Sequence, residues 1–282
     1  MSLLSTVVNN SSVSKAGTRT IIYGIEKQGK TTFCCGAPRP LLVPLEVGYV
    51  GMNVKLIPML ESFEQVMNLL DEIIAQVQAG QFPYQTLVFD SGTALERLIH
   101  DAVLRSDPTW GKGNKKALTL DSCLGGFGKA RLYAVELWSS FLAKCDLLAT
   151  RGMINIVITC HAFASKVTDP LQGEFDVWNV LLYSPKNNKS YGARELLTQW
   201  ADLVGFLHSP FFISQKEGSD LAKGISANKG RMLAVNYSPS YIAGNRYKIT
   251  SEGISIPLEK GWNSLANEIY SSCGLDYFNR DQ

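Results

Sequence analysis

The sequence has few of the residues that bind structural metals or cross-link secreted proteins. It contains six cysteines and three histidines among 282 residues, and no two cysteines have C-x-x-C spacing, which argues against a structural zinc site. The first residues have neither the basic region nor the long apolar core of a signal peptide. No uncharged apolar run reaches membrane-spanning length. We therefore expect reduced cysteines, a cytoplasmic location and no membrane partner.

The chain also lacks a strong charge of either sign. Its 27 basic and 25 acidic side chains give a net charge of +2, so any basic surface must be local. Hydrophobic residues make up 45% and charged residues 18% of the chain, which is typical of a globular protein. Without an internal repeat or long linker, residues 19–282 are expected to form a single domain. Residues 1–18 are polar and predict an N-terminal arm, either a frayed terminus or a segment that docks on a neighbouring subunit.

Residues 20–32 hold the most specific motif. From Gly24 to Thr31 the sequence reads G-x-x-x-x-G-K-T, preceded by a β-favouring apolar run and followed by a plausible first helical turn. In that order, backbone N–H groups and a helix N-terminus surround a triphosphate. Lys30 would reach the β- and γ-phosphates, and Thr31 would ligate Mg²⁺. The residues expected to bind the nucleotide are Gly24, Glu26, Lys27, Gln28, Gly29, Lys30, Thr31 and Thr32, although Lys27 could instead point to solvent.

Two later apolar runs end in carboxylates. The first ends in Glu46 and contains Pro44, which cannot donate to a sheet ladder and suggests a kink. The second ends in Asp90, which we expect to hold Mg²⁺ opposite Thr31. Hydrolysis needs a group that positions or activates water, and the residue after Asp90 is a serine. Glu46 is the candidate for that role, the alternative being an exposed or capping glutamate.

His161 ends an apolar run at 154–161 and could sense the γ-phosphate, unless it is an ordinary core or loop histidine.

Strands and helices alternate along the chain, which predicts an α/β fold with a mostly parallel sheet covered on both faces. Residues 106–130, 162–190 and 208–230 are expected to be irregular. Helices are predicted at 62–77 (opened by a capping box at Ser62), 94–104, 130–151, 193–200 and 262–273, short strands at 54–57 and 202–207, and a C-terminal antiparallel hairpin from 231–237 and 246–250.

These motifs follow the order of the RecA family core: the phosphate loop, a strand-end glutamate, Asp90-Ser91 and a polar strand end at His161. The chain resembles RecA-like P-loop ATPases, and more narrowly the short phage-encoded ATPases of single-strand annealing and recombination, over about residues 19–250. The resemblance implies ATP and Mg²⁺ as cofactors, catalysis by Glu46 with Lys30, and a sensor role for His161. It also implies a homo-oligomer, a ring or filament in the host cytoplasm. Within this oligomer, Arg231 or Arg246 would reach the γ-phosphate bound to a neighbouring subunit, unless these arginines are ordinary strand-edge charges.

The resemblance further implies that residues 106–129 and 162–190 line a DNA channel. Cations and aromatic faces in these stretches suit single-stranded DNA, held by phosphate contacts and base stacking, although lysine-rich loops often simply face water. We therefore expect a DNA-stimulated ATPase. The alternatives are a nucleotide-switched protein-interaction or loader module, and a metabolic kinase. The expected DNA-binding residues are Trp110, Lys112, Lys115, Lys116, Lys129, Arg131, Lys166, Lys186 and Lys189.

Overall fold

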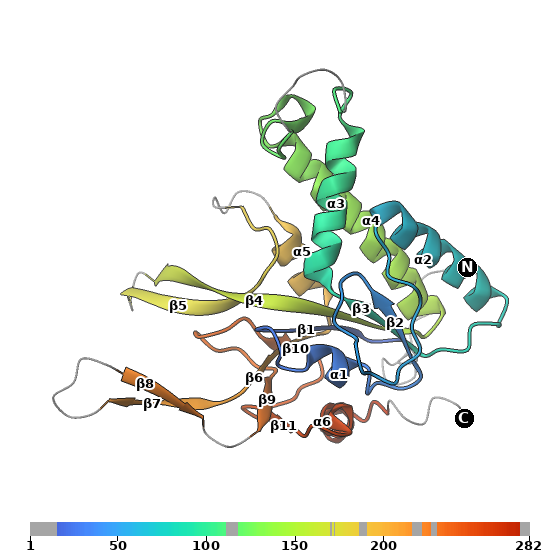
Figure 1. Ribbon diagram of the computed structural model, residues 1–282. Coiled ribbons are helices and arrows are strands. Elements are labelled where there is room, and N and C mark those ends of the chain that lie inside the picture. Colours follow the sequence, from blue (N-terminus) through green and yellow to red (C-terminus); the bar gives the residue numbers. More distant parts are fainter. Residues whose placement is uncertain are drawn as a thin grey trace, which may run out of the picture.

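The protein is described here from a computed structural model, shown in Figure 1. The part of the chain that it describes comprises residues 16–110, 118–169, 171, 173–185, 191–215, 222–226 and 230–276. The expected arm, residues 1–18, therefore lies largely outside the described residues. Gly17 and Thr18 are buried, and the backbone N–H of Gly17 donates to the carbonyl of Ala149. These two residues pack with the domain.

A nine-stranded sheet forms the centre of the molecule, in the order β11-β9-β6-β1-β4-β3-β2, with β10 beside β6 and β5 beside β4. The five central strands from β6 to β2 are parallel, and β5, β9, β10 and β11 are antiparallel to their partners. This arrangement confirms the expected α/β fold with a mostly parallel sheet. The strands are β1 (Arg19–Gly24), β2 (Pro40–Pro44), β3 (Thr86–Asp90), β4 (Asn155–Asp169), β5 (Gly173–Val180), β6 (Leu203–His208), β9 (Arg231–Ala234), β10 (Gly244–Asn245) and β11 (Ile254–Ile256).

Helices cover both faces of this sheet (Figure 1). Successive side chains of β1 point to opposite faces of the sheet. Ile21 and Tyr23 therefore pack into one hydrophobic cluster and Ile22 into another. The first face packs against α2, α3, α4 and α5, and the second against α1 and α6. The helices are α1 (Lys30–Cys34), α2 (Phe63–Gln78), α3 (Gly92–Ser106), α4 (Lys129–Arg151), α5 (Ala193–Trp200) and α6 (Gly261–Cys273).

Side chains at helix starts explain two of the boundaries. Ser62 accepts a hydrogen bond from the backbone N–H of Gln65 at the start of α2, and Ser91 accepts one from Ala94 in α3. In a capping box the Gln65 side chain would in turn accept a hydrogen bond from the backbone N–H of Ser62. Here it accepts one from the backbone N–H of Glu61 instead. In α4, Trp138 and Phe141 are buried as expected, but Leu132 lies on the exposed side.

Two of the segments predicted to be irregular instead contain β-hairpins. Strand β4 does not end at His161 but continues to Asp169, and its outer half pairs with β5. In the same way, β7 (Phe211–Gln215) pairs with β8 (Ala222–Ser226) in a separate two-stranded sheet. In Figure 1 both hairpins extend from the same side of the molecule.

The C-terminal strands are antiparallel, but their pairing differs from the predicted hairpin. The partner of β9 is β11, with Ile254 opposite Leu233, and residues 246–250 form no strand. Residues 54–57 also form no strand; they make one isolated bridge, between Leu56 and Leu42 of β2. Strand β2 lies at the end of the sheet order, where Pro44 is tolerated because an edge strand needs fewer ladder donors.

Candidate functional site

The phosphate loop joins β1 to α1 at the carboxyl ends of the parallel strands. Gly29 has φ of 76°, a left-handed conformation that favours glycine. Gly24 also has to be glycine, because an added Cβ would lie 2.3 Å from the carbonyl oxygen of Leu207 in neighbouring β6. Nζ of Lys30 donates to the carbonyls of Gly24 and Ile25, each at 2.9 Å. Burial lowers the pKa of this ammonium group.

The expected metal ligands face each other across the loop. Oγ1 of Thr31 donates to Oδ2 of Asp90 at 2.8 Å, and Oδ1 of Asp90 accepts a hydrogen bond from Thr159 of β4. Asp90 is almost completely buried, with 4% of its surface exposed. A hydroxyl and a carboxylate oxygen brought together in this way fit the oxygen ligands that Mg²⁺ prefers. Thr159 has no recognisable signal in the sequence, because its role depends on β3 and β4 being neighbours.

Glu46 and His161 form a pair next to the loop. Oε1 of Glu46 lies 2.9 Å from Nε2 of His161, and Oε2 accepts from Nη2 of Arg97 at 3.0 Å. The hydrogen bond from His161, with smaller contributions from Ser91 and Arg97, lowers the pKa of Glu46 to about 2. The carboxylate therefore stays charged at neutral pH. Arg97 lies on α3 and was not singled out from the sequence, where it is one charge among several on a helix face.

These groups share one pocket with a volume of about 340 Å³. Among the predicted nucleotide residues, Gly24 and Gln28 do not line it; the Gln28 side chain instead accepts a hydrogen bond from Ser209. Val47 and Gly48, which follow Glu46, complete the wall. The pocket is lined by Glu26, Lys27, Gly29, Lys30, Thr31, Thr32, Glu46, Val47, Gly48, Asp90 and His161.

Helix α3 links this pocket to the base of the β4–β5 hairpin. The Thr93 hydroxyl donates to the carbonyl of Leu181 and accepts from the backbone N–H of His161. Three residues further along, both carboxylate oxygens of Glu96 accept from the backbone N–H of Tyr183, at 2.9 and 3.0 Å. Burial raises the pKa of Glu96 to about 7. One face of α3 therefore contacts both the Glu46–His161 pair and the segment that follows β5.

The two arginines expected to act on a neighbouring subunit lie in different places. Arg231 is buried, with 8% of its surface exposed, and its guanidinium contacts the chain's own phosphate loop. The side chain is thus directed toward its own phosphate loop, and the expected role of Arg231 in trans stays a prediction.

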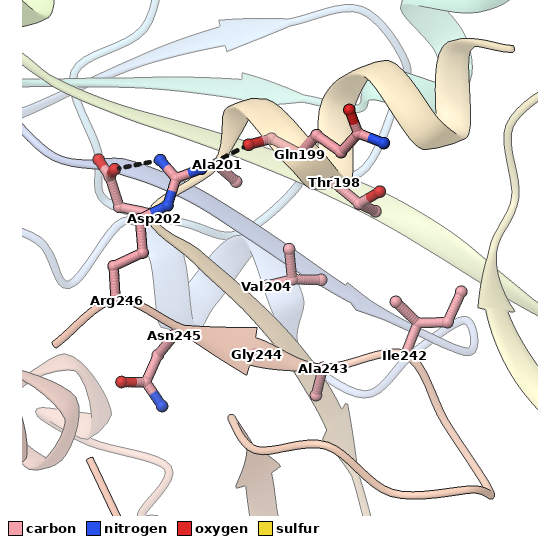
Figure 2. Close-up of a pocket in the computed structure, with 10 residues that line it drawn as sticks. All are labelled: Thr198, Gln199, Ala201, Asp202, Val204, Ile242, Ala243, Gly244, Asn245 and Arg246. Atoms are coloured by element: carbon pink, nitrogen blue, oxygen red, sulfur yellow. Dashed lines mark hydrogen bonds and ion pairs between the residues drawn. The ribbon is translucent and has the colours of Figure 1, made fainter. Parts of the chain in front are cut away.

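Arg246 lies at the amino ends of β1 and β6, away from the phosphate loop. Figure 2 shows its guanidinium beside the carboxylate of Asp202 and the backbone of Gln199, at 3.0 Å from Oδ1 and 2.6 Å from the carbonyl oxygen. Asp202 also binds Arg19 at the start of β1. The guanidinium of Arg246 borders a second cavity of about 390 Å³ with an apolar floor that includes Val204 and Ile242.

The expected DNA-binding residues divide into four groups. Lys112, Lys115, Lys116, Lys186 and Lys189 lie outside the described residues. In the segment between the end of α3 and the start of α4, Trp110 is 44% exposed and Phe127 is 97% exposed. Lys129, two residues after Phe127, is also exposed. Arg131 pairs with Asp121 at 2.9 Å and lies over the ring of Tyr183.

Lys166 lies on the outer half of β4 rather than in an irregular loop. It is exposed and stands opposite Asp176 of β5. Residues 162–180 contain this one lysine against three carboxylates, Asp169, Glu174 and Asp176. The hairpin is therefore acidic, which does not favour contact with a phosphate backbone.

A family model covers most of the chain. Residues 16–247 match the model of a family described as an AAA domain. Among solved structures, the chain is similar to a crystal structure of the RadB recombinase, with 12% identity and a TM-score of 0.41, covering 78% of this chain and 80% of that one. No curated protein sequence matches the chain. No helix among the described residues is long and apolar enough to cross a membrane.

Proposed function

We propose, given that this chain belongs to the AAA domain family, that it hydrolyses ATP with Mg²⁺ and that single-stranded DNA stimulates this turnover. The observation that carries the proposal is the convergence of Lys30, Thr31 and Asp90 with the Glu46–His161 pair in one pocket. Nucleotide-binding loops are common, but a carboxylate placed beside the metal ligands adds a group that can act on water. The sequence has no N/T-K-x-D guanine-reading motif, which favours ATP over GTP.

Five residues of the pocket have distinct roles in this reaction. Lys30, whose Nζ now contacts the carbonyls of Gly24 and Ile25, would bind the β- and γ-phosphates, and Thr31 and Asp90 would hold Mg²⁺. The bound ion would neutralise charge on the phosphates. Glu46, whose pKa is lowered by the hydrogen bond with His161, is a carboxylate that orients the attacking water. His161 fixes the direction of that carboxylate through the 2.9 Å contact.

The far end of α3 and α4 is the proposed DNA contact. Phe127 and Trp110 are large exposed aromatic residues, and Lys129 adds a cation next to Phe127. Phe127 follows two glycines with positive φ, a backbone that presents its ring to solvent. Aromatic rings that bases can stack on, together with cations for phosphates, bind single strands without reading their sequence. We place this activity in phage-type recombination or annealing, carried out by a homo-oligomer in the host cytoplasm.

A second candidate is a nucleotide-switched module that binds a protein partner. The acidic β4–β5 hairpin favours it, because this hairpin follows directly from His161 and would repel DNA rather than attract it. In this reading ATP would alter the hairpin and its partner through β4. DNA would then have no effect on ATP turnover.

The rate of ATP turnover, measured with and without a poly-dT oligonucleotide at low salt, tests the two candidates. We expect stimulation by the oligonucleotide, loss of turnover in Lys30→Ala, and binding that weakens steeply as salt rises. Turnover without any oligonucleotide binding would remove the DNA proposal and leave the second candidate. Absence of any turnover or nucleotide binding would remove both.

A further inference from the structure

Arg231 contacts the phosphate loop from behind, on the side away from the pocket. Its Nη1 donates to the carbonyls of Gln28 and Gly29, both at 3.2 Å, and its Nη2 donates to the carbonyl of Pro257 at 2.8 Å. Arg231 is the first residue of β9 and stands opposite Ile256 of β11. The guanidinium therefore connects the phosphate loop to the segment that leads into α6.

These contacts help to fix the direction of two peptide units, although the carbonyl of Gly29 also accepts a hydrogen bond from the backbone N–H of Phe33 in α1, at 3.0 Å. In a trans peptide, the carbonyl and the following N–H point in opposite directions. Because the carbonyls of Gln28 and Gly29 point to Arg231, the N–H groups of Gly29 and Lys30 point away from it. Gly29 and Lys30 line the pocket, whereas Arg231 does not. The arginine thus orients N–H donors toward the place that phosphate oxygens would occupy.

The fit between the arginine and the loop is close. A Cβ added at Gly29 would lie 2.4 Å from Nη1 of Arg231. Glycine at this position therefore permits both the close approach of the guanidinium and the positive φ. The guanidinium is buried, yet within the described residues it forms no ion pair with a carboxylate. A buried cation held only by carbonyls lacks an opposite charge nearby, and a polyphosphate on the other side of the loop would supply one.

We infer that Arg231 is a positioning residue for the nucleotide, acting within its own subunit: it orients the phosphate loop and supplies a buried positive charge behind the phosphates. This inference rests on the proposed ATPase function and assigns it a residue outside the phosphate-loop motif. Arg231 affects phosphate contacts that are equal in the ground state and the transition state. Its loss should therefore raise KM and leave kcat nearly unchanged.

The test compares Arg231→Gln and Arg231→Lys with the unchanged full chain, by calorimetry with Mg-ATP and Mg-ADP and by steady-state ATP turnover. Loss of charge-assisted hydrogen bonds should weaken binding by about tenfold or more in Arg231→Gln, with kcat within about threefold. Arg231→Lys keeps the charge and should lose less affinity. Arg151→Gln, an exposed arginine at the end of α4, is the matched control and should bind like the unchanged chain.

The inference is overturned if both Arg231 variants bind within about twofold of the unchanged chain. It is also overturned if kcat falls with KM unchanged, which would indicate an interaction made only in the transition state. If Arg231→Gln does not fold, Arg231→Lys decides alone, and an affinity within about twofold of the unchanged chain overturns the inference. Lys30→Ala separates the two proposals. If it abolishes binding while the Arg231 variants bind normally, only the role of Arg231 fails; if the unchanged chain binds no nucleotide, both fail.

Discussion

Oε1 of Glu46 lies 2.9 Å from Nε2 of His161, although their strands are not neighbours. Strand β3 lies between β2 and β4 in the sheet, so the pair spans the end of the strand that carries Asp90. The carboxylate is thereby placed in one pocket with Thr31 and Asp90. Replacing either partner should affect the chemical step more than the binding of nucleotide.

The first prediction concerns Glu46→Gln, which keeps the shape of the side chain and removes its charge. We expect ATP turnover to fall by about 10²–10⁴-fold, the range for groups that act on water or protons. Mg-ATP affinity should stay within about threefold, because Lys30 and the phosphate loop are unchanged. Single-turnover kinetics and calorimetry measure the two effects, with exposed Glu64→Gln on α2 as the control. An equal loss of affinity and turnover would contradict the role in catalysis.

Glu96→Gln tests the buried carboxylate on α3. Its folded-state pKa of about 7 exceeds the ordinary value of 4.5, so the free energy of unfolding should fall as pH rises from about 4.5 to 7. Glutamine still accepts a hydrogen bond from Tyr183 but cannot ionise. We expect the variant to be more stable than the unchanged chain by about 1–3 kcal/mol at pH 8 and similar to it at pH 4.5. Denaturant unfolding at the two pH values measures this; a difference that does not depend on pH would refute it.

Phe127→Ala tests the proposed DNA contact. Its ring is 97% exposed, so its removal should leave the melting temperature unchanged. Stacking of a base on an aromatic ring contributes about 1–3 kcal/mol, which corresponds to a loss of affinity for a dT oligonucleotide of about fivefold or more. Fluorescence anisotropy at low salt measures this affinity. Tyr270→Ala, an exposed aromatic residue on α6, is the matched control, and equal affinities of the two variants would argue against stacking at Phe127.

Gly24→Ala tests the close approach of β1 and β6. The new Cβ would meet a backbone oxygen, that of Leu207, which cannot move aside as a side chain can. We expect a loss of about 3 kcal/mol in the free energy of unfolding. Gly244→Ala in β10 is the control, because nothing lies within 4 Å of its added Cβ, and it should change stability by about 0.5 kcal/mol or less. Similar stability of the two variants would show that the strands separate easily.

Much of the parallel sheet and its helices could be predicted from the sequence. Helix α5 has the predicted bounds, 193–200, and α6 begins one residue before the predicted start. These elements carry apolar residues at regular spacing and pack against the sheet, so their pattern reflects their environment. The position of Glu46 could also be anticipated, because carboxyl ends of parallel strands meet at one edge of a sheet.

The two β-hairpins and the contacts of Arg231 and Arg97 could not be predicted from the sequence. The outer half of β4 is largely exposed, and its strand conformation comes from pairing with β5 rather than from a buried face. Arg231 contacts carbonyls some two hundred positions earlier in the chain, and backbone partners leave no trace in side-chain patterns. The contact of Arg97 with Glu46 likewise depends on how α3 lies beside the end of β2.

Pro44 limits how the carboxylate of Glu46 can move. Its ring fixes φ near −65°, its carbonyl accepts from the backbone N–H of Leu60, and the next N–H, of Leu45, donates to the carbonyl of Asp90. The backbone that leads to Glu46 is therefore anchored on both sides up to the preceding residue. Any reorientation of Glu46 between His161, Arg97 and a water molecule would come from rotation about its own side-chain bonds, a fast motion that needs no rearrangement of the sheet.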